Sequence, residues 1–267
     1  MALRVAAHTS IFQQYGFDQV KQSEKIADII AQAGFDAIEW HHTTFVGDDY
    51  KNRLEHAQRN SGLDLVGVTH SLPLWNQAEY ERITDILDEH AEKMSSIGPG
   101  FTCNLSCSGK ASADRNPSQN EHFVQVWTEV CGLFDSLDLK VSYQNNGDSQ
   151  ANLDYLIENF EEEESLFFCP DIHSLQTAGI DPVGFLDKNG DRIASLHIRD
   201  YHTDGGRTVV IGEGDLPLKQ INATLQAIEF DGDVIVDLIL PSGTPPDQPL
   251  LEILTKSCQA ISENLTL

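Results

Sequence analysis

Residues 195–202 read SLHIRDYH, a buried-strand pattern that ends in two histidines, an arginine and an aspartate within six residues. Side chains alternate between the two faces of a strand, so His197 and Arg199 share one face, and Leu196 and Ile198 share the other. Asp200 and His202 then fall at the rim of the strand or in the following loop. The alternation makes His197 and Arg199 the better candidates for an active site.

The pattern of a short apolar run followed by a longer amphipathic segment repeats along the whole chain. Eight apolar runs occur, at 4–10, 36–42, 64–71, 100–107, 140–147, 166–173, 192–200 and 233–240. Helical patterns lie at 20–34, 50–61, 76–97, 118–137, 151–160, 181–190, 216–228 and 248–264. Eight alternations predict an α/β fold, a single (β/α)8 TIM barrel over residues 1–267. The alternative, a doubly wound open sheet with a dinucleotide site, lacks a GxGxxG motif after its first run.

The charge composition of the chain limits the classes of molecule that it is expected to bind. The chain has 42 acidic and 17 basic side chains, for a formal net charge of -25. Such a surface repels nucleic-acid phosphates and anionic lipid, so neither is an expected partner. The acidic run at 161–164 is expected to be a solvated helix end. Five cysteines without CxxC spacing, together with the absence of a leader or a long apolar run, favour a reduced, cytoplasmic protein.

Polar residues concentrate where the apolar runs end. Of the ten histidines, only His56, His90 and His122 fall on helical patterns. Active sites of (β/α)8 barrels lie at the C-terminal ends of the strands, so this rim is the predicted site. For any one residue, a helix cap or plain solvent exposure is an open alternative. The rim residues are His8, Glu39, His41, His42, His70, Asn104, Gln144, Asn145, Asn146, Asp171, His173, His197, Arg199, Asp200, His202 and Asp237.

Four of these residues could form a metal site. Aspartate and histidine with a further oxygen donor make a mixed set that suits Zn, Mn, Co or Mg and leaves a position open for substrate. Because Gln144, Asp171, His197 and Asp237 are far apart in the sequence, only the fold can bring them together.

Several segments resemble the sugar phosphate isomerase/epimerase superfamily, whose members have a xylose isomerase-like barrel. The resemblance spans nearly the whole chain and is most specific in the HIRD and GEG motifs. It implies a barrel enzyme that acts on a small carbohydrate and commonly self-associates. The segments that carry it are IADIIAQAGFDAIEW (26–40), SGLDLVGVTHS (61–71), PDIHSLQTAGIDP (170–182), RIASLHIRD (192–200), IGEGDLPLKQI (211–221) and FDGDVIVDL (230–238).

The resemblance also implies a metal site with two departures from the family pattern. Family sites use a Glu that ends strand five, an Asp in strand six, the His of the HIRD-like motif and a Glu that ends strand eight. Asp171 and His197 match, whereas Gln144 and Asp237 stand in place of the two glutamates. The second family histidine of strand six corresponds to His173, one residue closer to the aspartate.

These departures change the expected chemistry. The two family glutamates also move protons beside a substrate carbonyl, and a neutral Gln144 cannot accept one. We therefore expect one-base chemistry, with His173, Glu213 or His70 as the catalytic group and Glu39 as a further candidate. Gln144 can still offer its amide oxygen to a cation, but the loss of a charge weakens metal binding and favours Zn or Mn over Mg.

Substrate-binding residues are expected along the same rim. Arg199, and Lys110 after the fourth run, could hold a carboxylate or phosphate, with ordinary surface salt bridges as the alternative. The other candidates for contact with the substrate are His8, Glu39, Asn104 and Asn146.

Three functions compete. The first is a metal-assisted isomerase or epimerase that abstracts a proton next to the carbonyl of a sugar or keto-sugar derivative, with a dehydratase or lyase on a related or inosose-like substrate as its variant. The second, an endonuclease IV-like DNA repair enzyme, is disfavoured by Gln144 and by the charge of -25. The third is a catalytically impaired barrel that serves as a binding protein, which Gln144 and Asn146 keep open.

Overall fold

The eight predicted strands form one parallel sheet that curls into a barrel. The computed structural model describes residues 3–98, 100–109, 115–160, 166–203, 206, 208–240, 243 and 245–266. The strands pair in the order β6-β5-β4-β3-β2-β1-β8-β7. Their bounds are β1 Arg4–His8, β2 Ala37–His41, β3 Asp64–Leu72, β4 Thr102–Cys107, β5 Lys140–Gln144, β6 Phe167–Phe168, β7 Ser195–Ile198 and β8 Asp233–Val236.

The barrel closes between its sixth and seventh strands through two isolated parallel bridges. Phe168 pairs with Ile193, and Asp171 pairs with His197. The backbone N–H of His197 donates to the carbonyl of Pro170 at 2.9 Å. This closure confirms the predicted TIM barrel, and it places Asp171 directly beside His197.

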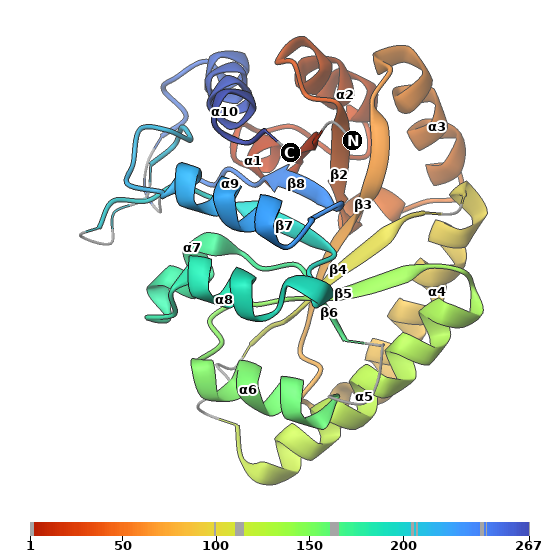
Figure 1. Cartoon of the computed structure of the whole chain (residues 1–267). Helices are drawn as coiled ribbons and strands as arrows, with labels where there is room; N and C mark the ends of the chain where they lie inside the picture. The colour runs from red at the N-terminus through yellow and green to blue at the C-terminus, as the bar shows by residue number, and fades with distance from the viewer. Residues whose placement is uncertain are drawn as a thin grey trace.

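Helices surround the sheet (Figure 1) and cover its outer face with apolar side chains. Leu196 and Ile198 belong to that outer core, as the alternation predicts. The helices are α1 Ser10–Gln14, α2 Ser23–Gln32, α3 Tyr50–Ser61, α4 Tyr80–Ile97, α5 Pro117–Ser136, α6 Gln150–Asn159, α7 Ile172–Thr177, α8 Pro182–Lys188, α9 Leu218–Ala227 and α10 Leu250–Asn264. None of these helices, in the part of the chain that the structure describes, is both long and apolar enough to cross a bilayer.

The sixth strand departs from the prediction. The run at 166–173 was expected to end as a strand at His173, but β6 stops at Phe168 and α7 begins at Ile172. Pro170 has no N–H for a strand ladder. The side chain of Asp171 then accepts a hydrogen bond from the backbone N–H of Ser174 at 2.8 Å and caps α7. His173 therefore lies in the first turn of a helix.

The interior of the barrel is apolar at one end of its axis and polar at the other. Ala6, Ala37, Val66 and Ile235 form a small apolar cluster of their own, separate from the outer core. Further along β2 the buried carboxylate of Glu39 follows the apolar Ala37 at the inward spacing of two residues. The polar end of the barrel is thus built on an apolar plug, and it faces the mouth formed by the C-terminal strand ends.

Candidate functional site

A small polar cavity of about 140 Å³ opens at the mouth of the barrel. Its walls are imidazoles, carboxylates, amides and hydroxyls from the ends of the strands. Nine of the predicted rim residues line it, among the residues that the structure describes: His8, His41, His70, Gln144, Asn145, Asn146, Asp171, Arg199 and Asp237. The fold thus brings together most of the rim residues that the sequence singles out.

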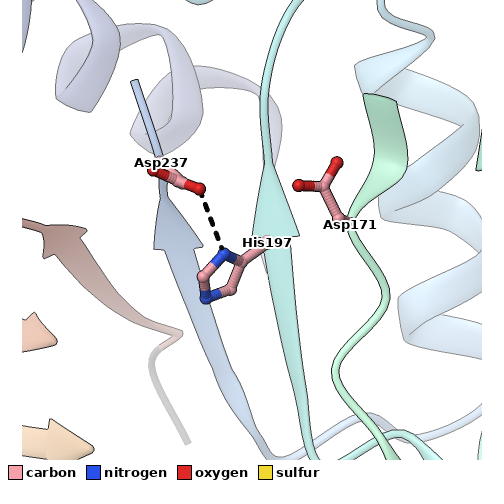
Figure 2. Close-up of side chains that lie close together, drawn as sticks. All are labelled: Asp171, His197 and Asp237. Atoms are coloured by element: carbon pink, nitrogen blue, oxygen red, sulfur yellow. Dashed lines mark ion pairs between the residues drawn. The ribbon is translucent and has the colours of Figure 1, made fainter. Parts of the chain in front are cut away.

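Asp171, His197 and Asp237 form the candidate metal centre. One possible ligand atom from each lies within 4.8 Å of the others, and all three side chains are buried. Figure 2 shows them reaching toward one another from neighbouring segments: the bridge after β6, strand β7 and the end of β8. Two carboxylates and an imidazole are a suitable mixed set for a divalent cation, with positions left open.

His197 is held by partners on both ring nitrogens. Its Nε2 lies 2.9 Å from Oε2 of Glu39, and its Nδ1 lies 3.5 Å from Oδ2 of Asp237. Burial opposes a charged imidazole, yet the Cys169 thiol and the Glu39 and Asp237 carboxylates raise the pKa of His197 well above its ordinary value. Without a metal, the ring is therefore protonated on both nitrogens, and a bound metal would have to displace one of these protons.

Gln144 makes direct contact with this histidine. Its Nε2 lies 2.9 Å from Nδ1 of His197, and its side chain is buried. An amide can donate to a neutral ring nitrogen or, turned over, accept from a protonated one. A glutamate could only accept. Gln144 thus adapts to either state of His197 and places no charge beside it.

The carboxylate of Asp237 contacts three side chains, those of His8, His197 and Arg199. His8 Nδ1 lies 3.0 Å from its Oδ1, and a guanidinium nitrogen of Arg199 contacts its Oδ2, the oxygen that also faces His197. Burial alone would raise the pKa of the Asp237 carboxyl, but Arg199 and His8 hold it well below the usual range. The carboxylate is therefore ionised at neutral pH, and in the cation-free protein it is paired with Arg199 and His8.

Glu39 and Asn104 lie one layer below the cavity. Neither is among the described residues that line it, and their exposed fractions are 0% and 1%. The Asn104 amide donates to Glu39 and accepts from the hydroxyls of Ser142 and Ser195, the latter at 3.2 Å. The geometry gives Glu39 and Asn104 protein partners in place of the substrate contact predicted for them. They support the site from beneath.

His173 and Glu213, two of the predicted catalytic residues, do not join the described residues that line the cavity. The ring of His173, in α7, packs edge-on against Tyr201 with centroids 5.9 Å apart. Glu213 is exposed in the loop before α9, and its charge reaches Lys256 on α10. Of the three predicted catalytic residues, the fold brings only His70 to the mouth.

Asp200 explains why the HIRD and GEG motifs occur together. Its Oδ2 accepts from the backbone N–H of Gly212 at 2.7 Å and of Gly214 at 2.8 Å, and its Oδ1 accepts from that of Leu216 at 3.1 Å. Asp200 is a buried anchor of the GEG loop. His202 lies further out and is exposed, as expected for a loop position. The anchored loop turns Glu213 to solvent.

A histidine stack, comprising His41, His42, His70 and His90, adjoins the cavity, which His41 and His70 line. His42 stacks on His70 with centroids 4.0 Å apart, and His90 packs 4.8 Å from His70. His90 falls on a predicted helical pattern and is not among the predicted site residues. Its position three residues after the buried Leu87 was the available signal that it faces inward.

Two predictions lie partly or wholly outside the described residues. Lys110, a candidate for anion binding, and the acidic run at 161–164 fall in segments that the structure does not describe.

The family model for the xylose isomerase-like TIM barrel matches residues 27–256, which is most of the chain. The chain belongs to this family. The match covers the segments that carry Asp171, His197 and Asp237, so this xylose isomerase-like barrel has its candidate metal centre within the part of the chain that the family model matches. No curated protein is similar enough in sequence to count as a relative.

Solved structures share the whole fold at low sequence identity. A D-allulose 3-epimerase from Methylomonas sp. has a TM-score of 0.77 at 14% identity, covering 99% of this chain and 98% of its own. A probable 3-DHS dehydratase of petrobactin synthesis from Bacillus anthracis has a TM-score of 0.77 at 15% identity, covering 97% and 99%. A sugar phosphate isomerase/epimerase from Parabacteroides distasonis has a TM-score of 0.72 at 14% identity, covering 98% and 94%. These likenesses establish the fold.

Proposed function

We propose that this barrel is a metal-assisted isomerase or epimerase that abstracts a proton next to the carbonyl of a sugar or keto-sugar derivative. The observation that carries the proposal is the convergence of Asp171, His197 and Asp237 beside a polar cavity at the barrel mouth. The activities of the epimerases and isomerases that share the fold support the same reaction class.

The residues present fit a divalent cation. Asp171 and Asp237 would supply carboxylate oxygens and His197 would supply Nδ1, because its Nε2 already faces Glu39. A carboxylate behind a metal-binding histidine fixes the ring and its tautomer. When bound, such a cation polarises a carbonyl oxygen and acidifies the neighbouring C–H. Zn and Mn suit this set better than Mg, because one donor is nitrogen.

His70 is the proposed base. It lines the cavity, and neither of its buried ring nitrogens has a hydrogen-bond partner among the described residues. Burial first, and then His42 and His90, lower its pKa to about 2, so the imidazole is neutral at neutral pH and keeps one unprotonated ring nitrogen.

The cavity favours a small polyhydroxy compound. Beside the candidate ligands, three imidazoles and Arg199, it is lined by hydroxyls and amides, among them Ser10, Thr69, Ser71 and Asn146. Such groups pair with sugar hydroxyls, whereas pockets for apolar ligands have apolar walls. The ligand is therefore a small carbohydrate, and neither nucleic acid nor lipid is a proposed partner.

A dehydratase or lyase is the second candidate. With Gln144 neutral, the mouth offers one proposed base where a two-base epimerisation needs two. Removal of one proton, followed by departure of a β-hydroxyl as water with that same proton returned to its oxygen, would need no second base on the opposite face of the carbon. The dehydratase with the same fold supports this variant.

Deuterium exchange tests the proposal. The protein is loaded with Zn²⁺ or Mn²⁺ and incubated in D₂O with a panel of ketoses and keto-sugars, and NMR follows deuterium entry beside the carbonyl. Exchange that is lost in Asp171→Asn and His197→Ala, but kept in Glu213→Gln, supports the proposal. An unsaturated product identifies the lyase variant. Absence of exchange and of elimination across the panel contradicts both and favours the impaired barrel.

A further inference from the structure

The position between the two candidate carboxylate ligands is already taken by a cation of the protein itself. One guanidinium nitrogen of Arg199, Nη2, lies 3.0 Å from Oδ2 of Asp171 and also contacts Oδ2 of Asp237. A single nitrogen therefore bridges the two carboxylates. The Arg199 side chain is 18% exposed, while both aspartate side chains are 2% exposed, so the bridge lies at the floor of the cavity.

A bound metal would need the same space. Metal–oxygen distances for the candidate ions are about 2.0–2.2 Å, so an ion shared by the two carboxylates would lie where Nη2 now lies. Arg199 would also place a positive charge against the ion at close range. Gln144, in contact with His197, contributes no negative charge to offset that repulsion.

The guanidinium is not fixed on all sides. Its Nε is buried without a hydrogen-bond partner among the described residues, so its anchoring rests on the two aspartates. Arg199 is also the one lysine or arginine among the described residues that line the cavity. A guanidinium displaced from the aspartates would therefore bring the cavity its first unpaired permanent cation.

We infer that Arg199 is an internal competitor for the metal: its guanidinium neutralises Asp171 and Asp237 in the cation-free protein, and metal uptake displaces it into the cavity. This inference takes from the proposed function only the metal site, and it concerns binding, which is measured without substrate. It deepens that function, because the displaced guanidinium would favour a substrate that carries a carboxylate or phosphate.

Metal titration of purified protein tests the competition. Zn²⁺ and Mn²⁺ dissociation constants are measured by calorimetry for the wild type and Arg199→Gln. Removal of the competing charge is expected to tighten binding at least tenfold, or about 1.4 kcal/mol. Arg4→Gln is the matched control, because Arg4 pairs with Asp233 at the opposite end of the barrel, at 2.5 Å. It should change affinity less than twofold.

Unchanged or weaker binding by Arg199→Gln overturns the inference. If neither protein binds metal, the pair is repeated with Gln144→Glu added to each, and absence of binding there also overturns it. Should Arg199→Gln fail to fold, the wild type gives a second measurement: modification of Arg199 by phenylglyoxal, followed by peptide mass spectrometry, should accelerate on addition of Mn²⁺. An unchanged rate overturns the inference. The two tests can give different answers. If Arg199→Gln binds metal more tightly but no deuterium exchange occurs, Arg199 still competes with the metal, and only the proposed reaction is rejected.

Discussion

The Nε2 atom of His197 lies 2.9 Å from Oε2 of Glu39, and neither side chain is exposed to solvent. The carboxylate comes from β2 and the imidazole from β7, on strands separated by β1 and β8 in the barrel. This cross-barrel contact turns the other ring nitrogen, Nδ1, toward Asp237. Glu39 thus acts as a positioning residue for the candidate metal ligand.

Glu39→Gln should weaken metal binding and release the proton from His197 more readily. Loss of a carboxylate behind a ligating histidine typically costs about 10–100-fold in metal affinity. The pKa of His197, followed by NMR of the imidazole, should fall because a negative neighbour is lost. Glu213→Gln removes an exposed carboxylate and should change neither quantity. An unaltered His197 titration in Glu39→Gln would show that the contact does not hold the imidazolium.

Gln144→Glu should strengthen metal binding. The new carboxylate would lie against Nδ1 of His197, where the amide now lies at 2.9 Å, and would add a third negative charge to Asp171 and Asp237. We expect at least a tenfold lower dissociation constant for Zn²⁺ or Mn²⁺, or about 1.4 kcal/mol. Gln220→Glu makes the same exchange on the exposed face of α9 and should leave affinity unaltered. Equal affinities for the wild type and Gln144→Glu would place residue 144 outside the metal site.

Gly214→Ala should destabilise the loop that carries the GEG motif. A Cβ atom at this position would lie 2.3 Å from Oδ1 of Asp200 and 2.4 Å from the carbonyl of Tyr201, so the anchor must move. We expect a loss of about 1–3 kcal/mol in the free energy of unfolding, measured with urea. Gly132→Ala in α5 meets no atom within 4 Å and should stabilise the protein slightly. A neutral Gly214→Ala would contradict the anchoring role of Asp200.

The free energy of unfolding should decrease as the pH is lowered, because the folded state keeps His70 unprotonated. The unfolded chain takes up a proton near the ordinary pKa of 6.5, whereas burial first, and then the other histidines, lower the pKa of folded His70 to about 2. The unfolded state therefore binds more protons, and the free energy of unfolding decreases from pH 6.5 downward until about pH 2.

His70→Phe should make that decline shallower by up to about 1.4 kcal/mol per pH unit between pH 6 and 4.5, because one titrating group is removed. Urea unfolding at a series of pH values measures the slope. Ser71→Ala changes the neighbouring residue on β3 without removing an imidazole, and it should keep the wild-type slope. Equal slopes for the wild type and His70→Phe would contradict a buried, neutral His70.

The barrel was predictable because it repeats a local signal. Each strand reads as a short apolar run and each main helix as an amphipathic stripe, and these patterns depend only on neighbours in the sequence. Strand six shows where the signal ends: two residues of β6 and a helix cap at Asp171 look, in sequence, like one continuous run to His173. A proline and a capping hydrogen bond decided that boundary.

The sequence predicted many of the residues that line the cavity, but not how they pair with one another. Strand-end position brought His8, Gln144, Asp171, Arg199 and Asp237 to one cavity, because parallel strands place their C-terminal ends at one rim. The same reasoning placed Glu213 there, although the loop anchored by Asp200 turns it to solvent.

The sequence by itself determined the fold, the family resemblance and the rim on which the site lies, since periodicity and strand-end chemistry are written in local order. Only the tertiary structure decided that Glu39 supports His197 from below and that Arg199 bridges Asp171 and Asp237. These pairings join strands far apart in the chain. Their geometry follows from barrel closure and burial, because a buried charge must find a partner of opposite sign wherever the fold supplies one.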